Sequence, residues 1–332
     1  MTATLIGTSA TPELPKDLRI GVIYGGDSPE RPGSVASAEA AAKSLSRQAD
    51  ILGNLSVELI DLRGLDLTAL RSRIDVALLA CHGLGGEDGK IQGTLDTLGI
   101  PYTGSGVQAS AIGMDKDRVK QILLAQTIDT PRWVTPHPSH SMETTASTAH
   151  LTLGWPVFVK PAAGGGSLAA GIANDEEELA GLLRTGSQYE RFIIEEYLEG
   201  TPATVGVLEI GGQLTPLPVH TAFTDRQFYD YEAKHNPGER REVCPADLPG
   251  MVTTMLQQTA LRVHRAVGAH GVSRVDFLLH PSGRRPVLEI NTVPGLSERG
   301  NLATAAGAAG LSYDDLIRHV LMTAFTKASY VP

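Results

Sequence analysis

The sequence predicts an α/β protein in which an N-terminal lobe with a doubly wound parallel sheet is followed by two α+β lobes. The chain has 332 residues, more than the roughly 100–200 of an average domain, so we expect two or three lobes. Strand-like and helix-like runs alternate in the N-terminal third, which is typical of βαβ units. After Trp155 the strands are instead separated by glycine-rich turns, which favours α+β structure.

The N-terminal elements follow from hydrophobic periodicity and glycine placement. A β-type run at residues 19–24 meets Gly25-Gly26, and an alanine-rich helix is expected at 34–48. Two more strands are expected at 57–62 and 75–81, and a helix at 110–127. The Pro-, Ser- and Thr-rich stretch 131–150 indicates a lobe boundary nearby. We expect this division of the chain: a flexible tail at 1–18, an N-terminal lobe at 19–113, a central lobe at 114–202 and a C-terminal lobe at 203–332.

The second half predicts two antiparallel arrangements. A strand at 156–160, a glycine loop at 164–167 and a strand at 168–173 precede a helix opened by Asn174, with Glu177 at capping-box spacing. The other elements are strands at 192–196, 204–210 and 213–219 around Gly211-Gly212, a helix at 251–267, strands at 272–279 and 285–291 around a Pro-Ser-Gly turn, and a helix at 313–325.

Composition excludes several classes of protein. The net charge is −9, which gives no overall support for nucleic-acid binding. No apolar run approaches the roughly 18 residues of a membrane span. Two cysteines form neither a disulfide framework nor a zinc cluster, so we expect a cytoplasmic protein. The 36 glycines, several of them clustered beside strands, suggest phosphate binding.

Polar residues on two late strands are the most informative pattern. Side chains alternate along a strand, so Arg274 and Asp276 share a face, as do Glu289 and Asn291. Paired across a hairpin, the two carboxylates and the amide are oxygen ligands suited to Mg²⁺, and the arginine suits charge developing on an oxygen. The alternative is a hairpin whose charged side simply faces water. A turn at Pro294-Gly295 favours the first interpretation because it could aim a backbone N–H at the same place.

Other candidate site residues are weaker signals. Lys160 ends a strand before a loop of small residues whose N–H groups could cradle phosphate, although a plain loop is equally compatible and the loop is not a Walker A motif. Lys116 and Lys234 are uninformative alone. His82 follows a strand end, where ligands bind in open α/β sheets. Its neighbour Cys81 points the other way on a strand, so no Cys-His nucleophilic pair is expected.

Taken together, these segments resemble the D-alanine–D-alanine ligase family of ATP-grasp enzymes. The resemblance runs from about residue 19 to 325. It rests on residues 24–31 (YGGDSPER), 82–93, 101–106 (PYTGSG) with 114–116 (MDK), 228–234 (FYDYEAK), and 274–291 followed by Pro294-Gly295. It implies three lobes with ATP between the central and C-terminal ones, transfer of the γ-phosphate to a D-amino acid carboxylate, and attack on the acyl phosphate by a second molecule.

The resemblance also implies roles for individual residues. Catalytic roles fall to Glu30, which would anchor the first substrate's ammonium, to Arg274 and Gly295, which would stabilise the oxyanion, and to His235. Substrate-binding residues would be Glu30, His82, Lys234, Gly300 and Asn301. The implied nucleotide-binding residues are Lys116, Lys160, Gly165, Gly166, Ser167, Glu195, Glu196, Tyr197, Leu198 and Lys234, with Glu195 on the adenine side. Asp276, Glu289 and Asn291 would carry two Mg²⁺ ions, or Mn²⁺ in their place. A homodimer is implied as well.

Four positions depart from the family pattern. Gly166 and His235 stand where a serine and a tyrosine usually form a hydrogen bond, Gly300 replaces a serine that takes the acceptor's carboxylate, and Pro202 replaces a ribose-binding glutamate. A partly cationic His235 would repel an ammonium and tolerate a hydroxyl, as in the D-alanine–D-lactate ligases. The alternatives are therefore a ligase with another acceptor, such as D-lactate or another amino acid, and a nucleotide-binding paralogue with impaired turnover. A nicotinamide-dependent dehydrogenase would leave Asp276, Glu289 and the glycine loop unexplained.

Overall fold

The N-terminal part of the chain forms a parallel sheet. The computed structural model describes residues 14–137, 139–165, 169–186, 189, 191–224 and 240–327. Strand β1 (Arg19–Tyr24) lies between β2 (Ser56–Asp61) and β3 (Val76–Leu79) and is parallel to both. The helices that follow these strands are α1 (Arg31–Arg47), α2 (Leu67–Arg73), α3 (Lys90–Leu98), α4 (Val107–Met114) and α5 (Lys116–Ala125). The parallel-sheet expectation is confirmed.

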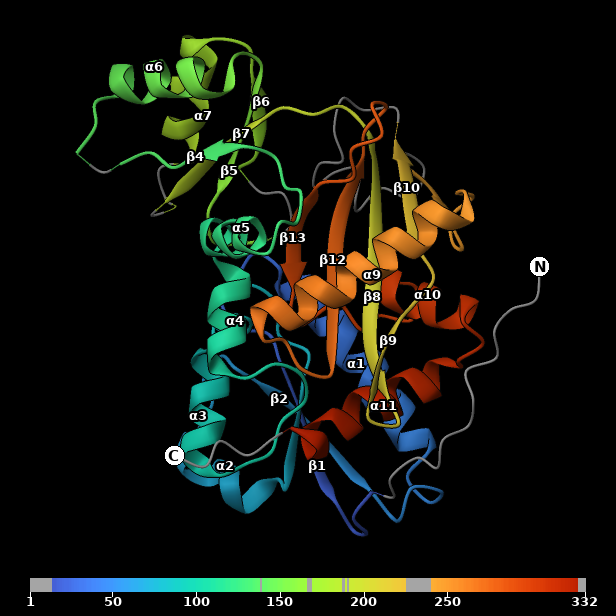
Figure 1. Cartoon of the computed structure of the whole chain (residues 1–332). Coiled ribbons are helices and arrows are strands. Elements are labelled where there is room, and N and C mark those ends of the chain that lie inside the picture. The colour runs from blue at the N-terminus through green and yellow to red at the C-terminus, as the bar shows by residue number, and fades with distance from the viewer. Residues whose placement is uncertain are drawn as a thin grey trace.

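A four-stranded antiparallel sheet follows, in the order β4-β7-β5-β6. Its strands are β4 (Trp133–Val134), β5 (Val157–Pro161), β6 (Gly171–Ala173) and β7 (Phe192–Glu196). Helices α6 (Met142–Leu153) and α7 (Glu176–Thr185) pack together with it around a core that includes Val157, Leu179 and Ile194. In Figure 1 this unit, with α6 and α7, projects away from the rest of the molecule at the upper left.

The larger antiparallel sheet has six strands. Five follow the order β11-β10-β8-β12-β13, and the sixth, β9, pairs with β8. The strands are β8 (Thr201–Ile210), β9 (Gln213–Pro216), β10 (His220–Thr224), β11 (Arg240–Val243), β12 (Val272–Leu279) and β13 (Val287–Asn291). Helices α9 (Gly250–Val267), α10 (Asn301–Ala308) and α11 (Tyr313–Thr326) complete this part of the chain. Figure 1 shows α9 crossing in front of β8 and β12.

Two hydrophobic cores join parts that are distant in sequence. Leu316 and Val320 of α11 share a core with Ile20 and Val22 of β1, so the last helix packs against the first sheet. Val119 of α5 belongs instead to the core of the six-stranded sheet. The three-lobe division of the chain stays a prediction. Within the described residues, no helix is both long and apolar enough to cross a membrane.

Several element boundaries differ from the sequence expectations. The single helix expected at 110–127 is two, because the Asp115 side chain accepts hydrogen bonds from the N–H groups of Asp117 and Arg118 and starts a new helix there. The stretch 131–150, near which a lobe boundary was expected, contains β4 and most of α6, which Ser141 caps. Helix α7 is capped by Asp175 rather than Asn174. Helices α2, α3 and α10 were not expected.

Candidate active site

A cavity of about 490 Å³ lies where the two antiparallel sheets and the start of α1 meet. It collects all the expected site residues that the structure describes. These are Glu30, His82, Lys116, Lys160, Gly165, Glu195, Glu196, Tyr197, Leu198, Arg274, Asp276, Glu289, Asn291, Gly295, Gly300 and Asn301. Gly166, Ser167, Lys234 and His235 lie outside the described residues.

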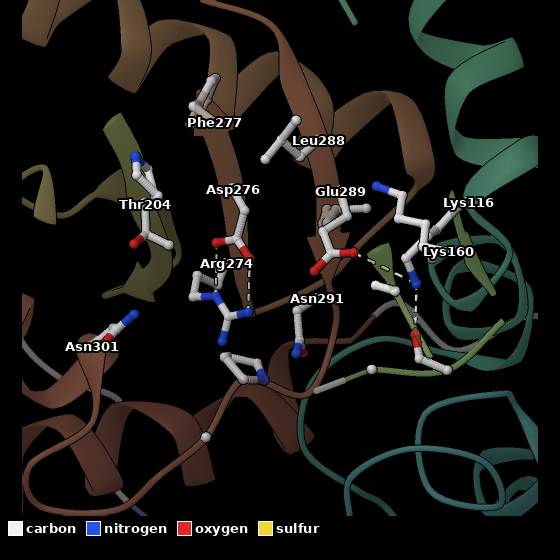
Figure 2. A pocket seen from close by; sticks show the side chains of 18 of the residues that line it. Lys116, Lys160, Thr204, Arg274, Asp276, Phe277, Leu288, Glu289, Asn291 and Asn301 are labelled. Carbon is white, nitrogen blue, oxygen red and sulfur yellow. Dashed lines mark hydrogen bonds and ion pairs between the residues drawn. The ribbon is translucent and has the colours of Figure 1, made fainter. Parts of the chain in front are cut away.

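The β12–β13 hairpin supplies the polar floor of the cavity. Asp276 pairs directly with Glu289 across the hairpin, and Arg274 pairs with Asn291, so all four side chains share a face as the alternation indicated. The Arg274 guanidinium donates two hydrogen bonds to the Asp276 carboxylate, at 2.9 and 2.8 Å. Figure 2 shows the Asp276 and Glu289 carboxylates on neighbouring strands of this hairpin.

An irregularity in the hairpin shapes the wall above these carboxylates. The register shifts between Asp276 and Phe277, because Glu289 pairs with Asp276 whereas Val287 pairs with Phe277. Leu288 is therefore the extra residue of a β-bulge. Leu288 and Glu289 both line the cavity despite being neighbours in sequence. The bulge thus places an apolar side chain beside the carboxylates.

The donor set of the hairpin fits magnesium. Asp276 and Glu289 offer carboxylate oxygens and Asn291 an amide, which are the hard ligands that Mg²⁺ takes while keeping waters or substrate phosphates. The Asn291 Oδ1 atom also accepts a hydrogen bond from the Val293 N–H, which fixes its direction. Among the described residues there is no group of three or more His, Cys, Asp or Glu placed to hold a metal. A magnesium ion bound by Asp276, Glu289 and Asn291 would complete its coordination with waters or substrate oxygens, as Mg²⁺ usually does.

Two lysines face this hairpin from the other side of the cavity. The Lys116 ammonium, at the start of α5, donates to the Gly164 carbonyl oxygen at 2.6 Å and lies 3.5 Å from a Glu289 oxygen. Lys160, at the end of β5, is largely buried, and its ammonium lies 3.0 Å from a Glu195 oxygen. Burial would lower the pKa of Lys160, but the nearby carboxylates, Glu195 above all, raise it. Lys160 therefore keeps its charge inside the cavity wall.

Glu195 is a buried carboxylate in the cavity wall, and its expected place on the adenine side stays a prediction. Glu195 is 2% exposed, and its carboxylate lies between the ammonium groups of Lys160 and Lys120. Burial would raise the pKa of Glu195, yet the two lysines hold it below its ordinary value. The Glu195 side chain thus holds Lys160 in position, and Tyr197 and Leu198 lie beyond it along the cavity wall. Sequence reasoning missed Lys120, whose only signal was a position one helical turn after Lys116.

Glycines leave room for the carboxylate of Glu30. Glu30 immediately precedes α1, and a Cβ atom built at Gly165 would lie 2.6 Å from its Oε1 atom. At Gly83, which has a φ of +77°, a Cβ would lie 2.9 Å from the same atom. A larger residue at Gly165 would displace Glu30, and one at Gly83 would displace Ser28 first and Glu30 with it. The glycine loop therefore approaches the carboxylate closely at the described residue Gly165.

His82 is neutral at the bottom of this region. Its Nε2 atom lies 3.0 Å from the Ser37 hydroxyl, which in turn accepts a hydrogen bond from the Leu296 N–H. Burial lowers the pKa of His82 to about 4. A neutral imidazole offers one hydrogen-bond donor and one acceptor and no positive charge.

Glu87 is a cavity residue that the sequence reasoning did not single out. It is 6% exposed, and its Oε2 atom accepts the Gly83 N–H at 2.7 Å. Burial and the negative charge of Glu30 raise the pKa of Glu87 to about 8. A protonated Glu87 would be a hydrogen-bond donor at neutral pH. The sequence signal was its place five residues after His82 in the glycine-rich segment.

The remaining wall comes from the segment after β13. Gly295 lies beside the Ser37 hydroxyl, and a Cβ atom there would still be 3.9 Å from Ser37 Oγ. Gly300 immediately precedes α10, whose first residue is Asn301. Figure 2 shows Asn301 on the Arg274 side of the hairpin, away from Lys116 and Lys160. The cavity therefore has a lysine end and an Asn301 end, with the hairpin carboxylates between them.

A parallel-sheet lobe followed by two antiparallel sheets that enclose lysines and carboxylates is the architecture of the ATP-grasp ligases. Family models described as "D-ala D-ala ligase C-terminus" and "D-ala D-ala ligase N-terminus" match residues 123–322 and 56–105. The chain therefore belongs to the D-alanine–D-alanine ligase family, whose members are ATP-dependent carboxylate–amine ligases.

Individual relatives support this assignment along nearly the whole chain. The D-alanine–D-alanine ligase of Geotalea uraniireducens is 35% identical over 317 residues, covering 95% of this chain and 98% of the relative. That of Gloeobacter violaceus is 39% identical over 311 residues, covering 92% and 98%. The structure of the Bacillus anthracis ligase complexed with ATP superposes with a TM-score of 0.77 at 30% identity, covering 93% of this chain and 97% of that one.

Proposed function

We propose that this protein joins two molecules of D-alanine at the expense of ATP, to give D-alanyl-D-alanine, ADP and phosphate for peptidoglycan precursor synthesis. The observation that carries the proposal is the placement of two lysines opposite the Asp276–Glu289 pair in the cavity that also holds Glu30. Such a site can hold a triphosphate and an amino acid side by side. Relatives that bear the name of this reaction match 92–95% of the chain.

The first half-reaction needs a carboxylate to meet the γ-phosphate. The Glu30 carboxylate would bind the ammonium of the first D-alanine and direct its carboxylate towards the hairpin. Lys116 and Lys160 would hold phosphate oxygens, since their ammonium groups flank the space in front of Glu289. Mg²⁺ held by Asp276, Glu289 and Asn291 would neutralise charge on the transferring phosphoryl group. Positioning and charge stabilisation supply most of the catalysis in reactions of this kind.

The second half-reaction is attack of an amine on the acyl phosphate. Oxygen of the attacked carbonyl gains negative charge in the tetrahedral intermediate, and the Arg274 guanidinium and the Gly295 N–H would stabilise it. Arg274 suits this role because Asp276 orients it through two hydrogen bonds while keeping it charged. The acceptor's carboxylate would bind at the Asn301 end, where the N-terminus of α10 presents backbone N–H groups.

The family likeness alone leads us to propose, further, that the protein works in the cytoplasm as a homodimer. Light scattering on the purified protein tests the dimer. Lys234 and His235, which the sequence resemblance assigns to the substrate side, stay proposals because they lie outside the described residues.

The experiment that tests the function is product analysis without a presumed acceptor. The protein is incubated with ATP, Mg²⁺ and a mixture of D- and L-amino acids and hydroxy acids, and products are identified by mass spectrometry. We expect D-alanyl-D-alanine as the main product, formed together with ADP. A D-alanyl-D-lactate product would show the altered acceptor instead. Absence of ADP formation with every acid would show an impaired paralogue and contradict the proposal.

A further inference from the structure

Four charged residues meet where the chain crosses between the two antiparallel sheets. The first crossing is the segment from 126 to 132, and the second is 197–200. Arg284 comes from the turn between β12 and β13, on the six-stranded sheet. Glu196 ends β7, on the four-stranded sheet, and Asp129 and Arg132 belong to the first crossing. The group therefore includes residues from both sheets and from the segment between them.

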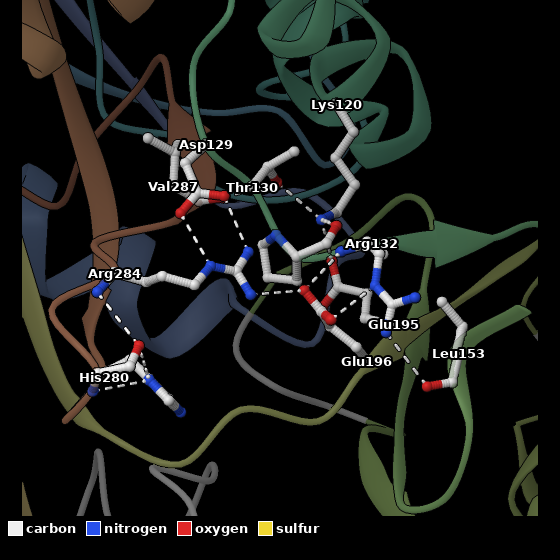
Figure 3. Close-up of polar contacts among 12 residues, drawn as sticks. Lys120, Asp129, Thr130, Arg132, Leu153, Glu195, Glu196, His280, Arg284 and Val287 are labelled. Carbon is white, nitrogen blue, oxygen red and sulfur yellow. Dashed lines mark hydrogen bonds and ion pairs between the residues drawn. The ribbon is translucent and has the colours of Figure 1, made fainter.

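The contacts among these residues are multiple and directional. The Arg284 guanidinium donates to both oxygens of Asp129, at 2.8 and 3.2 Å, and to Glu196 Oε1 at 3.0 Å. Glu196 also accepts from the Arg132 backbone N–H at 3.0 Å and from Arg132 Nε at 2.9 Å. Figure 3 shows Arg284 between Asp129 and Glu196. Arg284, from the six-stranded sheet, therefore contacts both the first crossing and the four-stranded sheet.

Backbone groups also form hydrogen bonds between the first crossing and the start of β13. The Val287 N–H donates to the Asp129 carbonyl oxygen at 2.8 Å, and the Thr130 hydroxyl donates to the Val287 carbonyl oxygen at 2.8 Å. At the second crossing, a Cβ atom on Gly200 would lie 2.6 Å from the Leu279 carbonyl oxygen. Both crossings therefore pack closely against the ends of β12 and β13. The Arg284 contacts are the side-chain component of this junction.

The junction borders the cavity directly. Glu196, Tyr197 and Leu198 line the cavity, and they are the residues at which β7 passes into the second crossing. Glu196 side-chain oxygens face the arginines, and the side chain is 11% exposed. Burial would raise the pKa of Glu196, but hydrogen bonds from Arg132 and Arg284 keep it below its ordinary value. The Glu196 carboxylate is therefore negatively charged and bound by the two arginines, and the next residues, Tyr197 and Leu198, form the cavity wall.

We infer that Arg284 is a positioning residue that fixes the distance between the two sheets at the end of the cavity formed by residues 196–198, and so prearranges the nucleotide site. The inference rests on the proposed function, because it takes ATP as the ligand between the sheets. A protein whose sheets are held at the binding distance loses less conformational freedom when the nucleotide binds. A substitution of Arg284 leaves in place the lysines and carboxylates that would surround the phosphates.

This role predicts a split between the kinetic constants. In Arg284→Ala the KM for ATP should rise about fivefold, which corresponds to about 1 kcal/mol, while kcat stays within about twofold. The KM for ATP of Arg284→Lys should lie between those of the wild type and Arg284→Ala, because one ammonium cannot bind both carboxylates as the guanidinium does. The side chains of Arg284 and Asp129 are 37% and 45% exposed, so salt screens their attraction. Added sodium chloride should therefore reduce the difference in the KM for ATP between the wild type and Arg284→Ala.

The matched control is Arg285→Ala. Arg285 lies in the same turn and carries the same charge, but its guanidinium donates to the carbonyl oxygens of His280 and Arg284 within that turn. The second variant is Asp129→Asn, which keeps the side chain's shape and removes its charge. We expect Asp129→Asn to raise the KM for ATP in the same direction, and the double variant with Arg284→Ala to add little to the single one. We expect Arg285→Ala to leave the KM unchanged.

Binding of a non-hydrolysable ATP analogue, measured by calorimetry on the same full-length variants, separates this inference from the proposed function. Weaker analogue binding in Arg284→Ala and Asp129→Asn but not in Arg285→Ala supports the positioning role, whatever product the enzyme forms. Equal binding and equal KM in wild type and Arg284→Ala would overturn it. A failure of the proposed function would appear separately, as a wild-type protein that forms no dipeptide.

Discussion

The Nζ atom of Lys120 lies 2.7 Å from the Oε1 atom of Glu195, and neither side chain is more than 3% exposed. Lys120 also donates to the Thr130 hydroxyl and to the Pro131 carbonyl oxygen. Glu195 uses its second oxygen for Lys160, so a fully buried pair sets the position of a lysine in the cavity wall. A buried ion pair of this kind is stable only as long as each charge keeps its partners.

Replacing Lys120 by methionine should therefore destabilise the protein. Removing one partner of a buried ion pair typically lowers the free energy of unfolding by about 3–5 kcal/mol. In this variant Lys160 would be the remaining cationic partner of Glu195 among the described residues. Urea denaturation of Lys120→Met measures this loss. Arg118→Met is the control, because Arg118 is an exposed residue of the same helix and should change the free energy of unfolding by about 0.5 kcal/mol or less. Equal stability of the two variants would contradict the account.

Replacing Glu289 by glutamine should weaken metal binding without unfolding the protein. The amide keeps the shape but removes the negative charge beside Asp276, so half-maximal activity should need at least about tenfold more Mg²⁺. A magnesium titration of the initial rate measures the shift. Glu143→Gln, an exposed change in α6, should leave the titration unaltered. The metal assignment is wrong if the Glu289→Gln and wild-type curves coincide.

Replacing Arg274 by lysine should mainly lower kcat. The lysine cannot keep two parallel hydrogen bonds to Asp276, so the charge that faces the forming oxyanion is displaced. Loss of one such donor typically costs about 10²–10³ in rate, and the KM for ATP should change by much less. Steady-state kinetics with D-alanine and ATP measures both constants. A large rise in KM with an unchanged kcat would instead indicate a ground-state binding role.

Replacing Glu87 by glutamine should change how stability depends on pH. The pKa of Glu87 is raised from 4.5 to about 8 in the folded protein. Between these values the folded state binds more protons than the unfolded state, so this group's contribution to stability is lost as pH rises. Glutamine does not titrate, so the Glu87→Gln variant does not lose this stability as pH rises. Its free energy of unfolding, relative to that of the wild type, should therefore increase from pH 5 to pH 8. Thermal unfolding across this range measures the difference, and a constant difference would rule out the raised pKa.

The hairpin at the centre of the site could be predicted because its signals are local. Alternation along β12, the Pro-Ser-Gly turn and alternation along β13 together place Arg274, Asp276, Glu289 and Asn291 on one face. The bulge at Leu288 could not be predicted, because regular alternation places Leu288 on the opposite face from Glu289. The sequence therefore showed the polar floor of the cavity but not its apolar wall.

Long-range charge pairs explain most of what the sequence reasoning missed. Nothing local to β7 indicates that Glu195 meets Lys120 of α5, so its contacts with two lysines could not be predicted. One miss was local: the Asp115 side chain caps the N–H groups ahead of it and divides one expected helix into two. Glu87 was missed because only its burial near Glu30 distinguishes it from an ordinary loop carboxylate.

The most direct test of the central claim follows the carboxylate oxygens of D-alanine. If Glu30, the lysines and the Asp276–Glu289 pair bring that carboxylate to the γ-phosphate of ATP, an acyl phosphate forms and one carboxylate oxygen leaves with the phosphate. With D-alanine labelled with ¹⁸O in both carboxylate oxygens, the account predicts one ¹⁸O atom in inorganic phosphate for each dipeptide formed, measured by mass spectrometry. Dipeptide formation with unlabelled phosphate, or with ¹⁸O in AMP, would contradict it.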